Sequence, residues 1–509
     1  MSESNWALDG FSAQRLRGIR RGIEKESLRS LSGGALAATP HPKALGSALT
    51  HPHITTDFSE SQIELITGVH VGIEDCLEEL RRVQNYTLAS MGEEMLWVSS
   101  MPCGLPADDA IPLGQYGSSN VGQAKTVYRS GLGYRYGRRM QTISGIHYNW
   151  SLPDVSSQDY FALIRNFRRH AFLLLYLFGA SPAVCSTFVH GRNHSLQELH
   201  PGTMGLPYAT SLRMGRLGYQ SDAQSALAVS YNSLEGYAGS LHQALTEPYA
   251  PYVDIGVRNA DGSFKQLATS LLQIENEFYG TIRPKRVIFQ GERPLHALRE
   301  RGVEYVEVRL MDLDPFEPVG IRASTLRFLD VFLLHCLTQP SPDDNPAEIA
   351  AMAHNQQCVA ERGREPGLQL QRGEALVDLS SWGLEIVEQL RPLAQALDQA
   401  HGGSAYVQAV ELAHHGLTDP DSLPSARVLH AMRQDHGGSF SAFVRSLSQQ
   451  TKAQELAQPL EAHALAHFHQ LAQASLARQR EIEAADTLPF DRYLQQYLSP
   501  ERLGQPKAS

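Results

Sequence analysis

The sequence predicts an α+β chain, in which strands and helices mix through residues 1–323 and a mainly helical region fills residues 324–509. Two observations support this division. Several segments before residue 324 alternate polar and apolar residues with a period of two, which is typical of strands with one covered face. Beyond it, apolar residues such as Leu326, Leu329 and Leu333 recur at three- and four-residue steps, which is typical of amphipathic helices. We expect the helical region to pack on the same domain.

Composition narrows the class of protein. A chain of 509 residues with 42% hydrophobic content can bury a large core, as two to four structural units or as one large domain. The net charge of -10 argues against a nucleic-acid partner. Five scattered cysteines without a C-x-x-C pair favour a reducing compartment over a disulfide framework. The apolar run from Ala171 to Ala180 is too short to span a bilayer, so we expect no membrane association and a cytoplasmic location.

Two glutamates near the start of the chain suggest a site for cations. Glu24 and Glu26 lie two residues apart in the segment RGIEKESLR, beside Ile23 and Leu28. In an extended strand both carboxylates project from one face, roughly 6 to 7 Å apart. Two neighbouring anions are tolerated when a cation lies between them, when one is protonated, or when both face water. Taken alone, the pair also fits a solvated face.

A second acidic stretch follows Asp57. Glu60, Gln62 and Glu64 alternate with apolar or small residues, so a strand places their side chains on one face. A helix through the same residues also brings Glu60 and Glu64 together, because positions i and i+4 share a face. Both alternatives predict an acidic stripe.

The segment from Gln141 to Pro153 predicts a strand with one polar face. Its alternation places His147 and Asn149 on one side and large apolar residues such as Trp150 on the other. The apolar side belongs to the core, so His147 faces a polar environment. A structural histidine held by hydrogen bonds is the alternative to a ligand here.

Two further strand regions carry cations and a carboxylate. Leu271–Tyr279 is a strand candidate that leads into a run from Ile282 to Arg286 with three cationic side chains. In the segment 302–309, Glu307 and Arg309 share one face, where a simple ion pair is the alternative to a binding role. The other elements that the patterns predict are helices at 70–91, 157–178 and 225–245, and a long ordered loop with one short helix at 101–139.

Taken together, these faces suggest a metal-dependent enzyme that handles phosphate. Hard divalent cations take oxygen ligands and share them with substrate phosphates, and arginine binds phosphate or carboxylate groups in a bidentate manner. The chain has no P-loop motif and no convincing dinucleotide-binding motif. The acidic set is Glu24, Glu26, Asp57, Glu64, His147 and Glu307, and the cationic set is Arg213, Arg283, Lys285, Arg286 and Arg309.

Longer blocks of the chain resemble one family. RRGIEKESLR, LGSALTHPHITTDFSESQIELIT, SMPCGLP, QYGSSNVGQAKTVYRSGL, QTISGIHYNWSLP, LPYATSLRMGRLGY, LQIENEFYGTIRPKR and VEYVEVRLMDLDPF occur in this order, and EAADTLPF lies near the end. They resemble the proteobacterial glutamate–cysteine ligase family, type 1. The resemblance implies a glutamine-synthetase-like fold, with a curved, mostly antiparallel sheet that forms an open funnel covered by helices.

The resemblance also implies an activity and residue roles. The activity is ATP-dependent joining of the γ-carboxylate of glutamate to the amine of cysteine, the first step of glutathione biosynthesis, with Mg²⁺ or Mn²⁺ as the metal. In that family the positions matching the acidic set hold the metal ions against ATP. Arg283, Lys285 and Arg309 are expected to bind phosphate, and Glu307 and Arg309 to take part in catalysis. The positions expected to bind substrate are Asn149, Arg213, Tyr219, Asn276 and Tyr279, with Tyr128 and Gln141 near cysteine.

Two alternatives stay open at this point. One is a ligase of the same fold that joins glutamate to another amine, and the other is an inactive relative that binds metabolites. We expect small-molecule substrates and a monomer.

Overall fold

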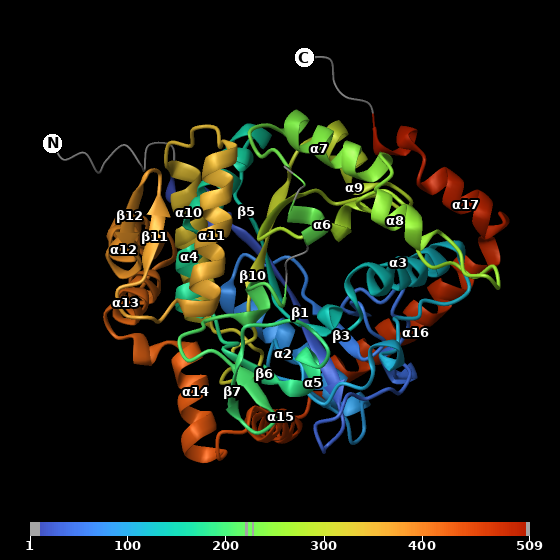
Figure 1. Ribbon diagram of the computed structural model, residues 1–509, viewed down its shortest axis with the longest axis horizontal. Helices are drawn as coiled ribbons and strands as arrows, with labels where there is room; N and C mark the ends of the chain where they lie inside the picture. Colours follow the sequence, from blue (N-terminus) through green and yellow to red (C-terminus); the bar gives the residue numbers. More distant parts are fainter. Residues whose placement is uncertain (1–10, 219–221, 226, 228, 505–509) are drawn as a thin grey trace.

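An antiparallel sheet of seven strands forms the centre of the computed structural model, which describes residues 11–218, 222–225, 227 and 229–504 (Figure 1). All of the pairings in this sheet are antiparallel. In spatial order the strands are β2 (Ile54–Thr56), β3 (Gln62–Ile66), β1 (Arg20–Ser30), β5 (Ile146–Ser151), β10 (Tyr305–Met311) and β9 (Ile282–Lys285), with β4 (Met95–Leu96) paired to the end of β1. The predicted α+β class with an open antiparallel sheet is confirmed.

The two faces of β1 have different partners. Ile23 is fully buried, and Arg21 and Lys25 turn to the same side, toward the helices. Glu24 and Glu26 turn to the opposite side and line a cavity. The period of two in the sequence therefore separates a covered face from an open one.

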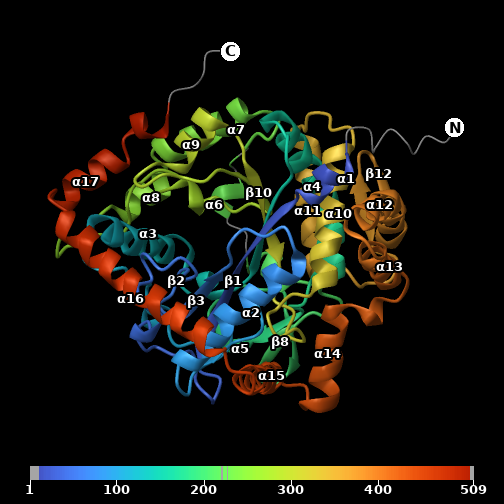
Figure 2. The same ribbon diagram turned by 180° about the vertical axis from the view of Figure 1, so that it is seen from behind.

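Three helices cover the closed face of the sheet: α2 (Ile73–Ser90), α4 (Ser157–Phe178) and α10 (Ala323–Thr338). Ser156 and Asp159 form a capping box that fixes the start of α4. The apolar run in α4 is buried against the sheet and α10, as expected for a core helix. Figures 1 and 2 show these helices on one side of the sheet and α3 (Asn120–Tyr136) on the other.

Residues beyond Ala323 are mostly helical in the structure. The hairpin of β11 (Gln369–Arg372) and β12 (Ala375–Asp378) interrupts this region, and α12 and α13 pack against α10. The helices are α11 (Pro346–Arg362), α12 (Leu379–His401), α13 (Ala405–Thr418), α14 (Pro424–Asp435), α15 (Phe440–Leu456), α16 (Ala462–Ala485) and α17 (Phe490–Tyr497).

The last two helices form an outer arm. Tyr86 of α2 stacks on Phe468 of α16, with ring centroids 5.0 Å apart. Further along, Glu483 accepts a hydrogen bond from the backbone N–H of Ser118, just before α3. At the far end, Arg293 donates to the carbonyl of Tyr497 at 2.9 Å. The arm thus connects α2, α3 and the start of α9 (Pro294–Arg301), segments that are far apart in the sequence (Figure 2).

A small second sheet lies beside the main one. It consists of β6 (Ala183–Cys185), β8 (Thr203–Gly205) and β7 (Gln197–His200), in that order. A disulfide joins Cys103 to Cys185 in this region, which is contrary to the reducing compartment that the cysteine pattern favoured. The remaining helices are α1 (Ala13–Arg17), α5 (Ser186–Val189), α6 (Asp222–Ser225), α7 (Leu234–Thr246) and α8 (Ala250–Ile255).

Three element predictions need correction. The acidic segment after Asp57 is the strand β3, and its helical alternative is wrong. The helix predicted to be short within 101–139 is α3, which has 17 residues, whereas the helix predicted from residue 225 begins at Leu234. The segment 271–279 is not a strand, because its acidic side chains turn inward into ion pairs around a single 3₁₀ turn at Glu275–Glu277.

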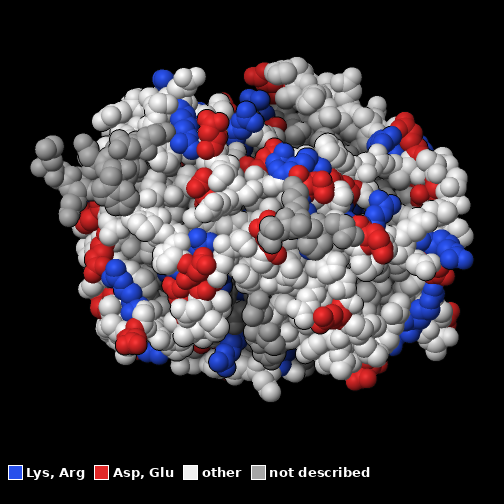
Figure 3. Space-filling model, turned by 90° about the horizontal axis from the view of Figure 1, so that it is seen from above, with Lys and Arg blue, Asp and Glu red and all other residues white. Residues whose placement is uncertain are grey.

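Surface properties agree with the composition. No helix within the described residues is long and apolar enough to cross a membrane. On the face seen in Figure 3, acidic and basic side chains are interspersed and form no extended basic stripe.

A buried ion pair connects the central strand to the covering helices. Arg21 of β1 donates to Asp330 of α10 at 2.6 Å, and both side chains are fully buried. Tyr148 donates to the same carboxylate at 2.7 Å. We expect Asp330→Ala to lower the free energy of unfolding by about 3–5 kcal/mol, because it leaves a buried guanidinium without its partner. Urea unfolding followed by circular dichroism measures this change.

The matched control is the exposed ion pair between Arg372 and Glu385. Glu385→Ala should cost less than about 1 kcal/mol. The double variant Arg21→Met/Asp330→Leu should recover most of the loss, since it removes both buried charges. Equal costs for the two single variants would contradict this interpretation.

Candidate active site

The open face of the sheet holds a polar cavity of about 230 Å³. Strands β1, β3, β5, β9 and β10 form its floor, and α3 forms one wall. Most of the site residues predicted from the sequence lie in its lining, namely Glu24, Glu26, Asp57, Glu64, Tyr128, Gln141, His147, Asn276, Tyr279, Arg283, Lys285, Glu307 and Arg309.

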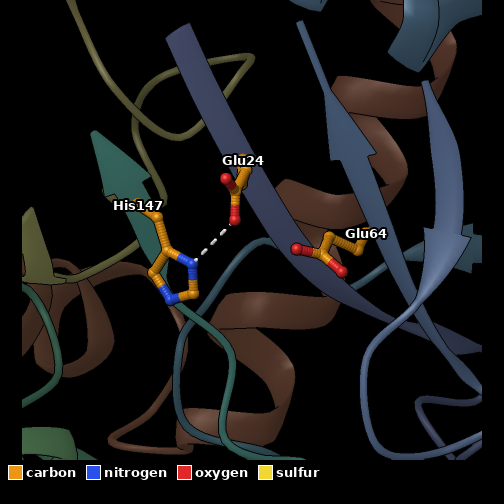
Figure 4. A group of neighbouring side chains, drawn as sticks. All are labelled: Glu24, Glu64 and His147. Carbon is orange, nitrogen blue, oxygen red and sulfur yellow. Dashed lines mark hydrogen bonds and ion pairs between the residues drawn. The ribbon is translucent and has the colours of Figure 1, made fainter. Parts of the chain in front are cut away.

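Three of these side chains converge from three neighbouring strands (Figure 4). Strand pairing places Glu24 opposite His147 and Glu26 opposite Glu64. Ligand atoms of Glu24, Glu64 and His147 all lie within 4.8 Å of one another. Nδ1 of His147 is 3.2 Å from a carboxylate oxygen of Glu24, the contact drawn in Figure 4. This close grouping could hold a metal ion.

The neighbouring strands β10 and β9 surround one carboxylate with cations. Glu307 lies 3.2 Å from Arg309 and 3.3 Å from Lys285, and Arg283 is 3.9 Å away. Glu307 is almost completely buried, so these charges act on it with little screening. The ion pair foreseen between Glu307 and Arg309 is therefore present, and it is one contact in a larger cluster.

The carboxylates have opposite electrostatic environments. Burial, reinforced by Asp57, raises the pKa of Glu26 to about 8. Burial and the neighbouring acids raise the pKa of Glu64 well above its ordinary range. For Glu307, burial is outweighed by Lys285 and Arg309, which hold its pKa well below the usual value. Burial thus outweighs the nearby positive charge at Glu26 and Glu64, whereas at Glu307 the positive charge outweighs burial.

These observations allow a test of whether the donor set fits a metal ion. Nε2 of His147 is buried and makes no hydrogen bond within the described residues. Burial and Arg309 lower the pKa of His147, so its ring is a neutral donor near pH 7. Carboxylate oxygens and a neutral imidazole are ligands for hard and borderline divalent cations. The donor set fits such an ion, which would also relieve the repulsion between the acids.

Asn149, Arg213 and Arg286 are not in the lining of the cavity. Asn149 donates to Glu24 at 2.9 Å and so orients that carboxylate from the side. Arg213 is fully buried beneath the site, where it donates to the carbonyl of Arg309 at 2.8 Å. A Cβ atom at Gly145 would overlap the Arg213 guanidinium, which explains the glycine at this position. Tyr219 lies outside the described residues.

Helix α3 supplies lining residues that the sequence analysis missed. Lys125 and Arg129 lie in the cavity wall together with Tyr128 and Leu132. The four positions follow the three- and four-residue spacing of one helix face. That spacing was available in the sequence, but it has meaning only once the segment is recognised as a long helix.

An acidic group and a cationic cluster meet at His147 in one small cavity and define an enzyme site for small, highly charged substrates. The family profile described as glutamate-cysteine ligase matches residues 8–359. The glutamate–cysteine ligase of Pseudomonas fluorescens (strain Pf0-1) is 48% identical over 494 residues, which cover 94% of this chain and 92% of that protein. The corresponding protein of Saccharophagus degradans is 46% identical over 509 residues, which cover 96% of each chain.

Solved structures indicate the same family as the sequence comparisons. The crystal structure of glutamate–cysteine ligase from Francisella tularensis in complex with AMP matches with a TM-score of 0.90 at 38% identity and covers 94% of this chain and 97% of that one. A bifunctional glutathione synthetase from Pasteurella multocida matches with a TM-score of 0.71 at 27% identity, over 92% of this chain and 57% of that one. The chain belongs to the glutamate–cysteine ligase family. The predicted family and enzyme class are confirmed.

The raised pKa of Glu26 predicts a pH-dependent stability. In the unfolded chain Glu26 ionises near its ordinary pKa, whereas the folded protein keeps the proton up to about pH 8. The contribution of Glu26 to stability is therefore complete below its ordinary pKa and is lost as the pH rises from there to about 8. We expect Glu26→Gln to lie within about 1 kcal/mol of the native protein at pH 5 and to exceed its stability at pH 9, by on the order of a few kcal/mol.

Urea unfolding in EDTA, from pH 5 to 9, measures this difference. Glu93→Gln, at an exposed position, serves as the matched control and should follow the native protein at every pH. If native and Glu26→Gln proteins had parallel pH profiles, the proposed environment of Glu26 would be wrong.

Proposed function

We propose that this protein joins the γ-carboxylate of glutamate to the amine of cysteine, with ATP as the phosphoryl donor. The supporting observation is the arrangement of the cavity, in which an acidic group suited to metal ions lies beside the cations around Glu307, in a chain of the glutamate–cysteine ligase family. Two charged substrates and a nucleotide need this combination, because carboxylate and phosphate oxygens must approach one another without repulsion.

The reaction has two chemical steps. A γ-carboxylate oxygen of glutamate attacks the γ-phosphorus of ATP, and the bond to ADP breaks to give γ-glutamyl phosphate. The cysteine amine then attacks the acyl carbon, the bond to phosphate breaks, and the amine loses a proton. The first step is needed because a carboxylate is a poor acylating agent.

The chain's residues have separate roles in this proposal. Glu24, Glu26, Asp57, Glu64, His147 and Glu307 would hold Mg²⁺ or Mn²⁺, which supplies positive charge to the phosphate oxygens. Arg309, Arg283 and Lys285 neutralise the charge that develops on the transferring phosphoryl group. Asn276 and Tyr279 position the amino acid substrates, and Gln141 holds the Tyr279 hydroxyl through a hydrogen bond of 2.7 Å.

Other residues act indirectly. Asn149 fixes the orientation of Glu24, and Arg213 supports the backbone at Arg309. Tyr128 lines the cavity, and we propose that it lies near the bound cysteine. Tyr219 remains a proposed substrate contact. We place the reaction in the cytoplasm and expect a monomer to carry it out.

Phosphate release tests the substrate assignment. With Mg²⁺, ATP and glutamate, we expect release to depend strongly on cysteine and more weakly on 2-aminobutyrate, which has a similar size but no thiol. Glycine and ammonia should support little release. Preference for another amine would instead favour the alternative, a glutamate–amine ligase of the same fold.

A second prediction concerns Glu307. Glu307→Gln keeps the shape of the side chain but removes the charge on which three cations converge. We expect cysteine-dependent phosphate release to fall by on the order of 100-fold or more, with a near-native circular dichroism spectrum. Glu24→Gln should behave similarly because it removes a proposed metal ligand.

The exposed substitution Glu93→Gln is again the matched control and should retain native turnover. Native turnover in Glu307→Gln would refute the role of that residue while leaving the family assignment intact.

A further inference from the structure

One block of the sequence has no place in the proposed chemistry. EAADTLPF, residues 483–490, covers the end of α16 and the start of α17, and none of its residues lines the cavity. It belongs to the outer arm, which runs along the outer side of α3 in Figure 2. Because the inner side of α3 forms a wall of the cavity, contacts between this block and α3 bear on the site.

The block first holds the start of α3 through two carboxylates. Glu483 accepts a hydrogen bond from the backbone N–H of Ser118 at 2.8 Å. Asp486 accepts one from the backbone N–H of Asn120, the first residue of the helix. The Asn120 side chain donates in turn to the carbonyl of Leu488 at 2.9 Å. The first N–H groups of a helix have no partner within it, and negative charge is favourable at this end, so these contacts fix the start of α3.

Helix α17 then joins α3 to a second part of the cavity wall. Leu494 of α17 is buried and belongs to an apolar cluster with Ala124 of α3 and Leu267. Ile274, the residue before the 3₁₀ turn at Glu275–Glu277, packs against the same cluster. This cluster therefore connects the arm, the helix α3 and the turn outside the cavity.

A charged side chain holds the same turn at the other end of α17. Arg293 is almost fully buried and pairs with Glu275 at 2.7 Å, while it donates to the carbonyl of Tyr497 at 2.9 Å. Its central carbon lies 4.7 Å from the centroid of the Tyr497 ring. Asn276, the next residue along the turn, lines the cavity. The contacts of α17 thus reach the lining through Arg293 and Glu275.

The two wall elements that the arm supports carry one class of proposed contact. Tyr128 of α3, and Asn276 and Tyr279 at the turn, are the residues that we propose to lie near the amino acid substrates. Lys285 and Arg309, which we propose to bind phosphate, extend from β9 and β10. Hydrogen bonds of the sheet fix the backbones of these strands. Loosening of the arm would therefore affect the two parts of the site unequally.

We propose that the segment 483–497 is a positioning element that holds α3 and the turn at Glu275–Glu277 at the spacing that the amino acid substrates require, with Leu494 as its central residue. This inference rests on the proposed function. Leu494 does not line the cavity, so it acts through the elements that it supports. A displacement of about 1 Å in groups that orient a substrate is enough to lower activity strongly.

Leu494→Ala tests this role, because it removes packing between α17 and the wall elements. We expect KM for cysteine to rise by about 5- to 20-fold and KM for ATP to stay within about twofold. Leu494→Met keeps the volume of the side chain and should restore KM for cysteine to within about twofold of the native value. Phosphate release, measured at a temperature at which every variant is fully folded, gives these constants.

Two further variants examine the carboxylates of the arm. Glu483→Ala/Asp486→Ala removes both acceptors at the start of α3 and should also raise KM for cysteine, by less than Leu494→Ala because both groups are accessible to water. Glu481→Ala is the matched control. Glu481 lies on the same helix and pairs with Arg478 one turn away, so its loss should leave all the kinetic constants unchanged.

Hydrogen exchange keeps the test independent of turnover. In Leu494→Ala, backbone amides of α3 and of the turn at 275–277 should exchange faster, and those of β1, β5 and β10 should exchange at the native rate. Native exchange in α3 would overturn the proposal. Faster exchange throughout the chain, or an equal rise in KM for ATP and for cysteine, would show a role in general stability alone and would also overturn it. If the native enzyme released no phosphate with cysteine while the exchange pattern held, the proposed function would fail and the support of α3 by the arm would stand.

Discussion

Repulsion between carboxylates on the open face of the sheet is the constraint on which the rest of the structure depends. Pairing of β1 with β3 and β5 brings Glu24, Glu26 and Glu64 together with His147 on the cavity floor. Several buried anions in one small volume destabilise a fold unless protons or cations neutralise them. Burial, reinforced by the neighbouring acids, raises the pKa values of Glu26 and Glu64, and this environment supports the proposal that the group binds divalent cations.

The covered face of the same sheet is anchored to the surrounding helices. Arg21, on the opposite side of β1, is anchored to α10 through Asp330, and Lys25 hydrogen-bonds to Gln84 of α2. The outer arm adds a second support, because α16 and α17 connect α2 to α3 and α9. Elements at both edges of the cavity are thus held by contacts distant in sequence, which favours a preformed site.

Strand periodicity predicted much of the site from the sequence. On β1, β5 and β10 the polar face is open and the apolar face is covered, so alternation alone placed Glu24, His147 and Glu307 correctly. The same reasoning failed at 271–279, where Glu275 and Glu277 are buried in ion pairs with Arg293 and Arg135. A pattern of alternating acids cannot distinguish an open face from a buried network of charges.

The length of helix α3 was underestimated because residue composition alone does not reveal tertiary packing. Its glycines lower helix propensity, yet Gly131 is needed because a side chain there would overlap Gln273. Glycine required by tertiary packing thus weakened the sequence signal of a helix whose inner face carries Lys125 and Tyr128. The family resemblance supplied residue roles that periodicity does not give. Arg213 shows the limit of sequence reasoning, because its contact with the backbone of Arg309 is visible only in three dimensions.

The central claim is that the acidic group on β1, β3 and β5 binds divalent cations. Anomalous diffraction from crystals grown with Mn²⁺ and a non-hydrolysable ATP analogue tests it most directly. Our account predicts manganese peaks between Glu24, Glu64 and His147, with the nucleotide phosphates beside them. Peaks that lie only elsewhere, with the nucleotide bound and these three side chains unliganded, would contradict it.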